Sequence, residues 1–134
     1  MLLVAVLIHA ATAARRTADT ASEMAAARSL GIGWSAYATD HRGAILPGYA
    51  SGYRARDLDG EWIDTETEPV AALRWPLRLA PYLGHDFRAL YSGPNSENLE
   101  GLADSPTASA LYAVSVSPSF GLNSLYMGGD QNYG

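Results

Sequence analysis

Residues Met1–Asp40 read MLLVAVLIHAATAARRTADTASEMAAARSLGIGWSAYATD, and this stretch decides the fold. It is rich in alanine, and the first proline of the chain is Pro47. A proline-free stretch of this composition predicts one continuous helix. At about 1.5 Å per residue, the helix would be roughly 60 Å long, which exceeds the width of a small domain. We therefore expect one end to project from the rest of the chain, into a membrane or a partner.

The predicted helix divides into two halves, 1–14 and 15–42. The first half is apolar and is expected to serve as a membrane and assembly helix, with the large side chains Leu2, Leu3, Val4, Val6, Leu7 and Ile8. In the second half, apolar residues recur at spacings of three and four, which is typical of an amphipathic helix. Four of them are expected to pack the helix against the rest of the chain: Met24, Leu30, Trp34 and Tyr37.

The apolar start allows three interpretations. A transmembrane helix needs about 20 apolar residues, and the segment 1–14 is shorter than that. A signal peptide cleaved after residue 13 or 14 would explain the small residues Ala11-Thr12-Ala13, but no basic residue precedes the apolar run, as signal peptides require. The third interpretation is that the sequence begins partway through a longer membrane segment, and we favour it because of the family resemblance described below.

Composition excludes several classes of function. The net charge is -5 with nine Lys and Arg residues, so a clustered basic surface for nucleic acid is not expected. Cysteine is absent, which excludes disulfides, thiolate metal sites and cysteine nucleophiles. The hydrophobic fraction of 48% is that of a globular protein.

Residues 43–134 are predicted to form a globular head, whose end after a Gly-Gly turn suggests an incomplete C-terminus. Pro69–Leu83 is predicted to be helical with a kink at Pro76. Strands are expected at 87–91, at Ala110–Val116, where apolar residues alternate, and at 119–127. The fold class expected is therefore α+β, with a long N-terminal helix packed on a small antiparallel sheet.

Calcium is the one cofactor that the sequence suggests. The polar segment 50–68 contains Asp57, Asp59 and Glu61, and Asp130 is a further candidate ligand. Oxygen ligands suit calcium, but the spacing matches an EF-hand loop poorly, and a solvated acidic loop is the simpler interpretation.

No catalytic motif is present. The three histidines, His9, His41 and His85, belong to no recognisable hydrolase or zinc-protease pattern, and Gly31-x-Gly33 lacks the third glycine of a dinucleotide-binding loop. We do not expect an enzyme.

Three fragments together resemble one family. They are Leu30-Gly31 with Tyr37–Pro47, then Trp75–Gly84, then Ser119–Ser124. Their order and spacing are similar to those of type II secretion pseudopilins and type IV pilin-like proteins that carry a prepilin-type N-terminal methylation segment. Met1–Ile8 resembles the part just after the processing site of that family. The cleavage glycine, the methylated residue and the glutamate that follow a prepilin leader are not in the sequence.

The resemblance implies a structural subunit of a secretion or pilus-type filament. Such a subunit would assemble with itself and with other pilins, contact membrane lipid, and be anchored in the bacterial inner membrane by a single pass, with its head in the periplasm or in an extracellular filament. An inner-membrane assembly platform and a prepilin peptidase would be partners if the true start lies upstream. The alternatives are a secreted or periplasmic binding module and, third, a small periplasmic enzyme using His41 or His85.

Overall fold

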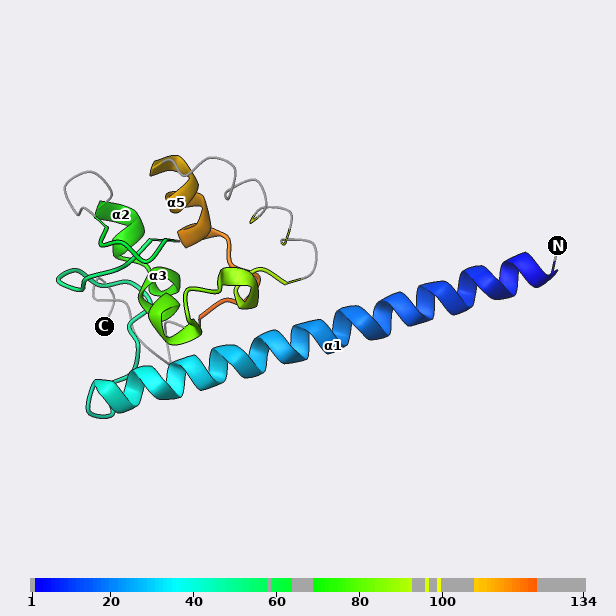
Figure 1. Ribbon diagram of the computed structural model, residues 1–134, viewed down its shortest axis with the longest axis horizontal. Helices are drawn as coiled ribbons and strands as arrows, with labels where there is room; N and C mark the ends of the chain where they lie inside the picture. Colours follow the sequence, from blue (N-terminus) through cyan, green and yellow to red (C-terminus); the bar gives the residue numbers. More distant parts are fainter. Residues whose placement is uncertain are drawn as a thin grey trace.

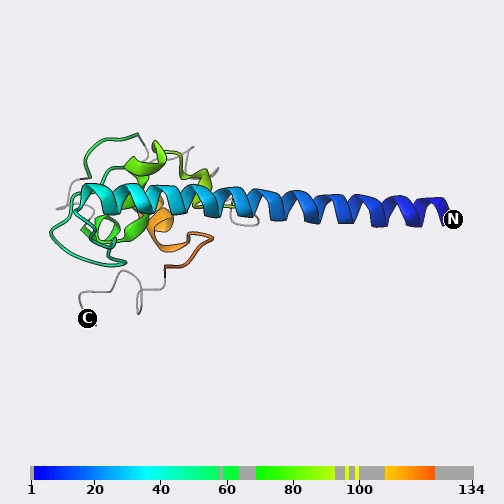
Figure 2. The same cartoon turned by 90° about the horizontal axis from the view of Figure 1, so that it is seen from below.

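A long helix dominates the computed structural model of the chain, which describes residues 2–57, 59–63, 69–92, 96, 99 and 108–122. Helix α1, Leu2–Asp40, runs for 39 residues without a break, and only its C-terminal part lies beside the other elements (Figures 1 and 2). Every side chain described from Val4 to Ala25 is exposed. We call residues 2–25 the stem and keep the word head for the part of the chain after Arg42.

The head packs on one stripe of α1. Ala26, Leu30, Gly33 and Tyr37 are the buried positions of the helix, and their spacings of four, three and four place them on one face. Met24, which was expected on this stripe, is 68% exposed. A step of two residues turns a helix by about 200°, so Met24 faces away from the side on which Ala26 is buried.

Gly33 lets the head approach the helix axis. A Cβ atom at this position would lie 2.9 Å from Leu83 Cδ2 and 3.6 Å from Leu79 Cδ1. At Gly31 a Cβ atom would meet nothing within 4 Å. Of these two glycines, therefore, Gly33 is the one at which the head approaches α1 closely, and the approaching residues belong to helical elements.

Tyr37 and His41 close the C-terminal end of α1. The two rings stack with centroids 3.9 Å apart, and the His41 Nδ1 atom lies 2.9 Å from the Tyr37 carbonyl oxygen. Tyr82 meets the Tyr37 ring edge-on at 5.6 Å. Gly43 then adopts a φ of 87°, which glycine tolerates without strain, and its N–H donates to the Ala38 carbonyl.

The described head consists of short helical elements around one apolar core. They are α2 (Pro69–Ala72), α3 (Trp75–Leu79), the 3-10 turns η1 (Ala80–Leu83) and η2 (Phe87–Ala89), and α5 (Ala108–Val116). Helix α1 contacts α3, η1 and η2, whereas α5 packs on α2 and α3. The largest fully enclosed aliphatic side chains are Leu46, Leu77, Leu79, Leu90 and Val114.

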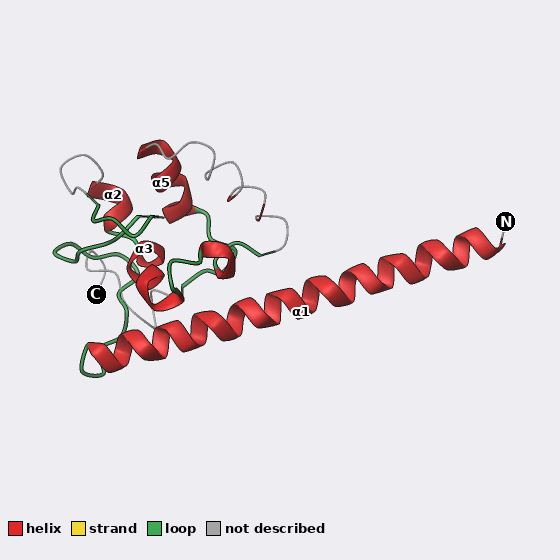
Figure 3. Cartoon of the chain, in the orientation of Figure 1, coloured by secondary structure: helices red, strands yellow, loops and turns green. Residues whose placement is uncertain are grey.

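The described residues contain no β-strand, so the expected α+β fold with an antiparallel sheet is wrong (Figure 3). Two isolated antiparallel bridges, Tyr49 with Arg74 and Arg56 with Trp62, are the extent of strand-like pairing there. Residues 123–127 of the third expected strand lie outside the described residues.

Two of the expected strands are helical for local reasons. In α5, Leu111, Val114 and Ser115 share the face turned to the core, and a run of seven residues fits the helical period as well as the alternating one. In η2, the Asp86 carboxylate accepts a hydrogen bond from the Arg88 backbone N–H, which closes a tight turn where a strand was expected.

The expected single-pass location in the inner membrane is also wrong. Within the described part of the chain, no helix combines the length and the apolar character that a bilayer crossing needs. In α1 the apolar run ends early, because His9, Thr12 and the pair Arg15-Arg16 follow it.

Arg78 braces the head from inside. It is 4% exposed, its guanidinium donates to the carbonyl oxygens of Pro47 and Ala50, and it lies over the Tyr53 ring. Burial lowers the pKa of Arg78 to about 10, so the side chain still carries its charge at neutral pH. The brace ties the loop after α1 to α3.

Tyr91 performs a similar task for α5. Its hydroxyl donates to the Val114 carbonyl, and its side chain is enclosed in the core. Burial raises the pKa of Tyr91 above its ordinary value of 10.0, because the charged phenolate would lose its hydration.

The two glycines of α1 provide a matched test of the docking geometry. Gly31→Ala should raise the free energy of unfolding by about 0.5–1 kcal/mol, because alanine is favoured over glycine within a helix. Gly33→Ala should gain less, because Leu83 must move to admit the new methyl group. Urea unfolding of both variants measures the difference, and equal gains would show that the head does not approach α1 closely at Gly33.

Tyr91 should make the protein sensitive to alkali. The unfolded chain releases the Tyr91 proton near pH 10, whereas the folded chain holds it, so the free energy of unfolding should fall by about 1.4 kcal/mol per pH unit above pH 10. Tyr91→Phe should remove this contribution and lower stability at pH 7 by about 1 kcal/mol through the lost hydrogen bond. Arg78 titrates in the opposite sense in both proteins and cancels in the comparison. Parallel stability curves for the two proteins between pH 9 and 11 would contradict the assignment.

Candidate functional site

The stem presents an apolar surface that the described head does not cover. Val4, Val6, Leu7 and Ile8 are between 59% and 64% exposed. Of the other predicted assembly residues, Leu2 and Leu3 lie in α1, and their side chains are outside the described set. Exposed apolar groups collected at one end of a helix are typical of an interaction surface.

Polar side chains of the stem form hydrogen bonds with the backbone of the same helix. The hydroxyls of Thr12, Thr17 and Thr20 each donate to the carbonyl oxygen four residues earlier, at 2.8–3.0 Å. His9 Nδ1 lies 2.8 Å from the Ala5 carbonyl oxygen in the same way. These groups therefore need no partner from a neighbouring molecule, which lowers the cost of covering them. The sequence signal for these bonds is the position of Thr and His within a helix, where their side chains reach the carbonyl oxygen four residues earlier.

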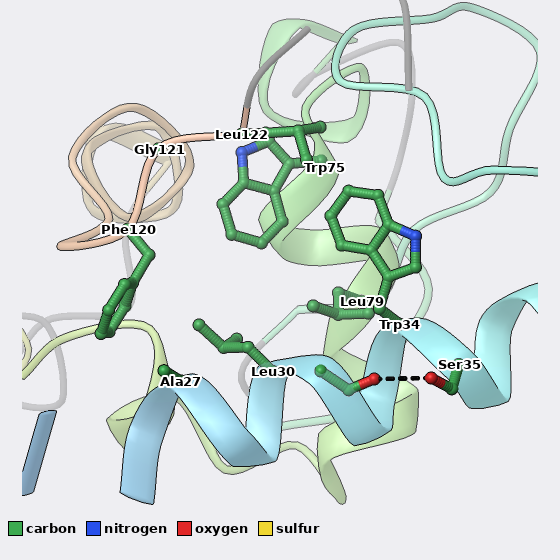
Figure 4. Close-up of a pocket in the computed structure, with 10 residues that line it drawn as sticks. Ala27, Leu30, Trp34, Ser35, Trp75, Leu79, Phe120, Gly121 and Leu122 are labelled. Atoms are coloured by element: carbon green, nitrogen blue, oxygen red, sulfur yellow. Dashed lines mark hydrogen bonds between the residues drawn. The ribbon is translucent and has the colours of Figure 1, made fainter. Parts of the chain in front are cut away.

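A groove lies between the C-terminal part of α1 and the head, beside the positions at which the two pack together. It has a volume of about 370 Å³ and apolar walls (Figure 4). Leu30 and Trp34 line it from α1, while Trp75, Leu79 and Phe120 line it from the head. Of the helix-packing residues expected from the sequence, Leu30 and Tyr37 are buried and Trp34 lies against the core at the edge of this groove.

A second hollow of about 320 Å³ adjoins the first. Trp75, Gly121 and Leu122 line both, and the second is more polar because Tyr49, Arg74 and Ser115 also line it. Neither hollow could be predicted from the sequence, because the lining residues come from four separate segments that only the fold brings together. We call the two hollows together the Trp75 cleft.

In the acidic loop, the Asp57 carboxylate stabilises the local turn. Asp57 Oδ1 accepts hydrogen bonds from the backbone N–H groups of Asp59 and Glu61 at 3.0 and 2.8 Å. The neighbouring Arg56 lies 4.1 Å from the centroid of the Trp62 ring and donates to the Gly60 carbonyl. No group of three His, Cys, Asp or Glu side chains that could hold a metal occurs among the described residues, and Asp130 lies outside them.

The histidines are far from forming a catalytic set in the described chain. His41 stacks on Tyr37 at the end of α1. His85 follows η1 with a φ of 59°, and its ring lies beside Gly60. His9 belongs to the exposed stem. The three side chains thus occupy three separate surroundings.

Comparison with other proteins assigns no function to these surfaces. No protein-family model matches the chain, and neither a curated protein nor a solved structure matches it.

Proposed function

We propose that the chain is a structural subunit that assembles with further copies of itself through the stem, in the manner of a pilin or pseudopilin-like filament. The observation that carries the proposal is the group of exposed apolar side chains on Val4–Ile8, on a helix that extends well beyond the head (Figure 1). The sequence fragments that resemble pilin-like proteins support the same proposal of a filament subunit, although the described head is helical.

The amount of apolar surface that association can bury favours an assembly of several stems over a pair. A fully buried Val, Leu or Ile side chain contributes about 1.5–3 kcal/mol, while association costs about 4–15 kcal/mol in lost freedom of motion. A stem surrounded by neighbours buries all its sides, whereas a stem in a pair buries only one. The small residues Ala5, Ala10, Ala11, Ala13 and Ala14 permit close approach between helices.

Charges on the stem favour parallel neighbours that are shifted along the axis. Arg15 and Arg16 come three to eight residues before Asp19 and Glu23. A parallel copy displaced by about 6–10 Å would set its basic pair opposite the acidic residues of the first copy, whereas an unshifted copy would place like charges side by side. The same order of charges supports repeated addition of subunits, because each shifted copy leaves the next pair available.

Leu7→Asp tests the proposal. A carboxylate within the apolar contact should raise the dissociation constant of the assembly roughly a hundred-fold or more, because it replaces about 3 kcal/mol of burial with the cost of a desolvated charge. Ile32→Asp is the matched control, because Ile32 is a similarly exposed apolar residue of α1, at 65%, that lies outside the stem. Sedimentation velocity over a range of concentrations measures the effect. A wild-type chain that stays monomeric, or a Leu7→Asp variant that assembles as well as wild type, would overturn the proposal.

A further inference from the structure

The Trp75 cleft has a chemical asymmetry that suggests a ligand. Its first hollow, between α1 and the head, is lined by Leu30, Trp34 and Phe120 among other apolar groups. Its second hollow is lined in part by Arg74. The two hollows share Trp75, Gly121 and Leu122, so an apolar hollow and a hollow lined by a cationic residue lie next to each other.

Arg74 has hydrogen-bonding capacity to spare. Its guanidinium carbon lies 5.7 Å from the ring centroids of both Tyr49 and Tyr112, so two aromatic rings contact it. Its Nε atom is enclosed and has no hydrogen-bond partner. Among the described residues, the ion pair that forms is Arg88 with Asp86, so no described carboxylate neutralises Arg74.

Backbone hydrogen bonds fix the position of Arg74 in the fold. Tyr49 and Arg74 form an antiparallel bridge, and the flanking hydrogen bonds run from Trp75 N–H to the Gly48 carbonyl and from Ala50 N–H to the Leu73 carbonyl. Arg74 is the N-cap residue of α3, and Pro76 lies in the first turn of that helix. Arg74 and Trp75 are therefore held as neighbours at the start of a rigid element, which is how a preformed binding site is built.

We propose that the Trp75 cleft binds a small amphiphilic carboxylate, an organic acid with an aliphatic or aromatic body. The carboxylate accepts hydrogen bonds from the Arg74 guanidinium, whose planar fork matches its two oxygens. The apolar body lies along Trp75 toward Leu30 and Trp34. Hollows of about 370 and 320 Å³ fall within the range of roughly 300–1,000 Å³ that small-molecule sites occupy. The site shares no lining residue with the stem surface proposed for assembly.

Octanoate is the first probe, and octanol, which shares the chain but lacks the charge, is the second. Titration into the full-length protein should change the fluorescence of Trp34 and Trp75, and calorimetry should give the dissociation constant. Octanoate binding should weaken as salt is added, because the contact with Arg74 is ionic. Octanol should bind more weakly than octanoate and without dependence on salt.

Arg74→Gln should raise the dissociation constant for octanoate about ten- to a hundred-fold, as expected from the loss of a charge-assisted pair of hydrogen bonds. It should leave octanol binding unchanged, which also shows that the variant is folded. Arg88→Gln removes the same charge from an exposed position outside the cleft and should bind octanoate like wild type. The proposal is overturned if octanoate does not bind to wild type, or if Arg74→Gln and Arg88→Gln bind it equally well.

Discussion

The packing of α1 against the head is the contact on which the rest of the structure depends. It uses four positions, Ala26, Leu30, Gly33 and Tyr37, and none of them carries a charge. Because Gly33 has no side chain, Leu83 reaches the helix surface, and the 3-10 turn η1 is held there. Tyr37 adds the aromatic contacts with His41 and Tyr82 that fix the end of the helix. The head is thus placed at one end of α1, and the stem is left exposed.

Inside the head, buried polar groups do what a sheet would otherwise do. Arg78 donates to two carbonyl oxygens of the loop after α1, and Tyr91 donates to the Val114 carbonyl oxygen in the last turn of α5. Such groups are costly to bury unless each donor finds an acceptor. Their cost is offset here by the loops that they hold in place, which would otherwise leave enclosed carbonyl groups unpaired.

Sequence reasoning succeeded where a single strong constraint operated. The absence of proline before Pro47 predicted a long helix, and α1 is one. It failed in the head, because the run Ala110–Val116 satisfies two periodicities and only contact with α2 and α3 selects the helix. It also misplaced Met24, since a stripe read at spacings of three drifts around the helix, whereas the buried stripe begins at Ala26. The Trp75 cleft could not be predicted, because local sequence patterns do not reveal which distant segments lie side by side in the fold.

One helix serves both as the stem and as a wall of the cleft, and this has a mechanical consequence. An unbroken helix, with no proline between its tip and Trp34, behaves as a stiff lever rather than a chain of joints. A tilt of the stem about the contact at Gly33 would therefore also change the angle of the helix segment that carries Leu30 and Trp34, which line the cleft. Neighbours that grip the far end would thus set the width of an opening tens of ångströms away, without any change in the residues that line it.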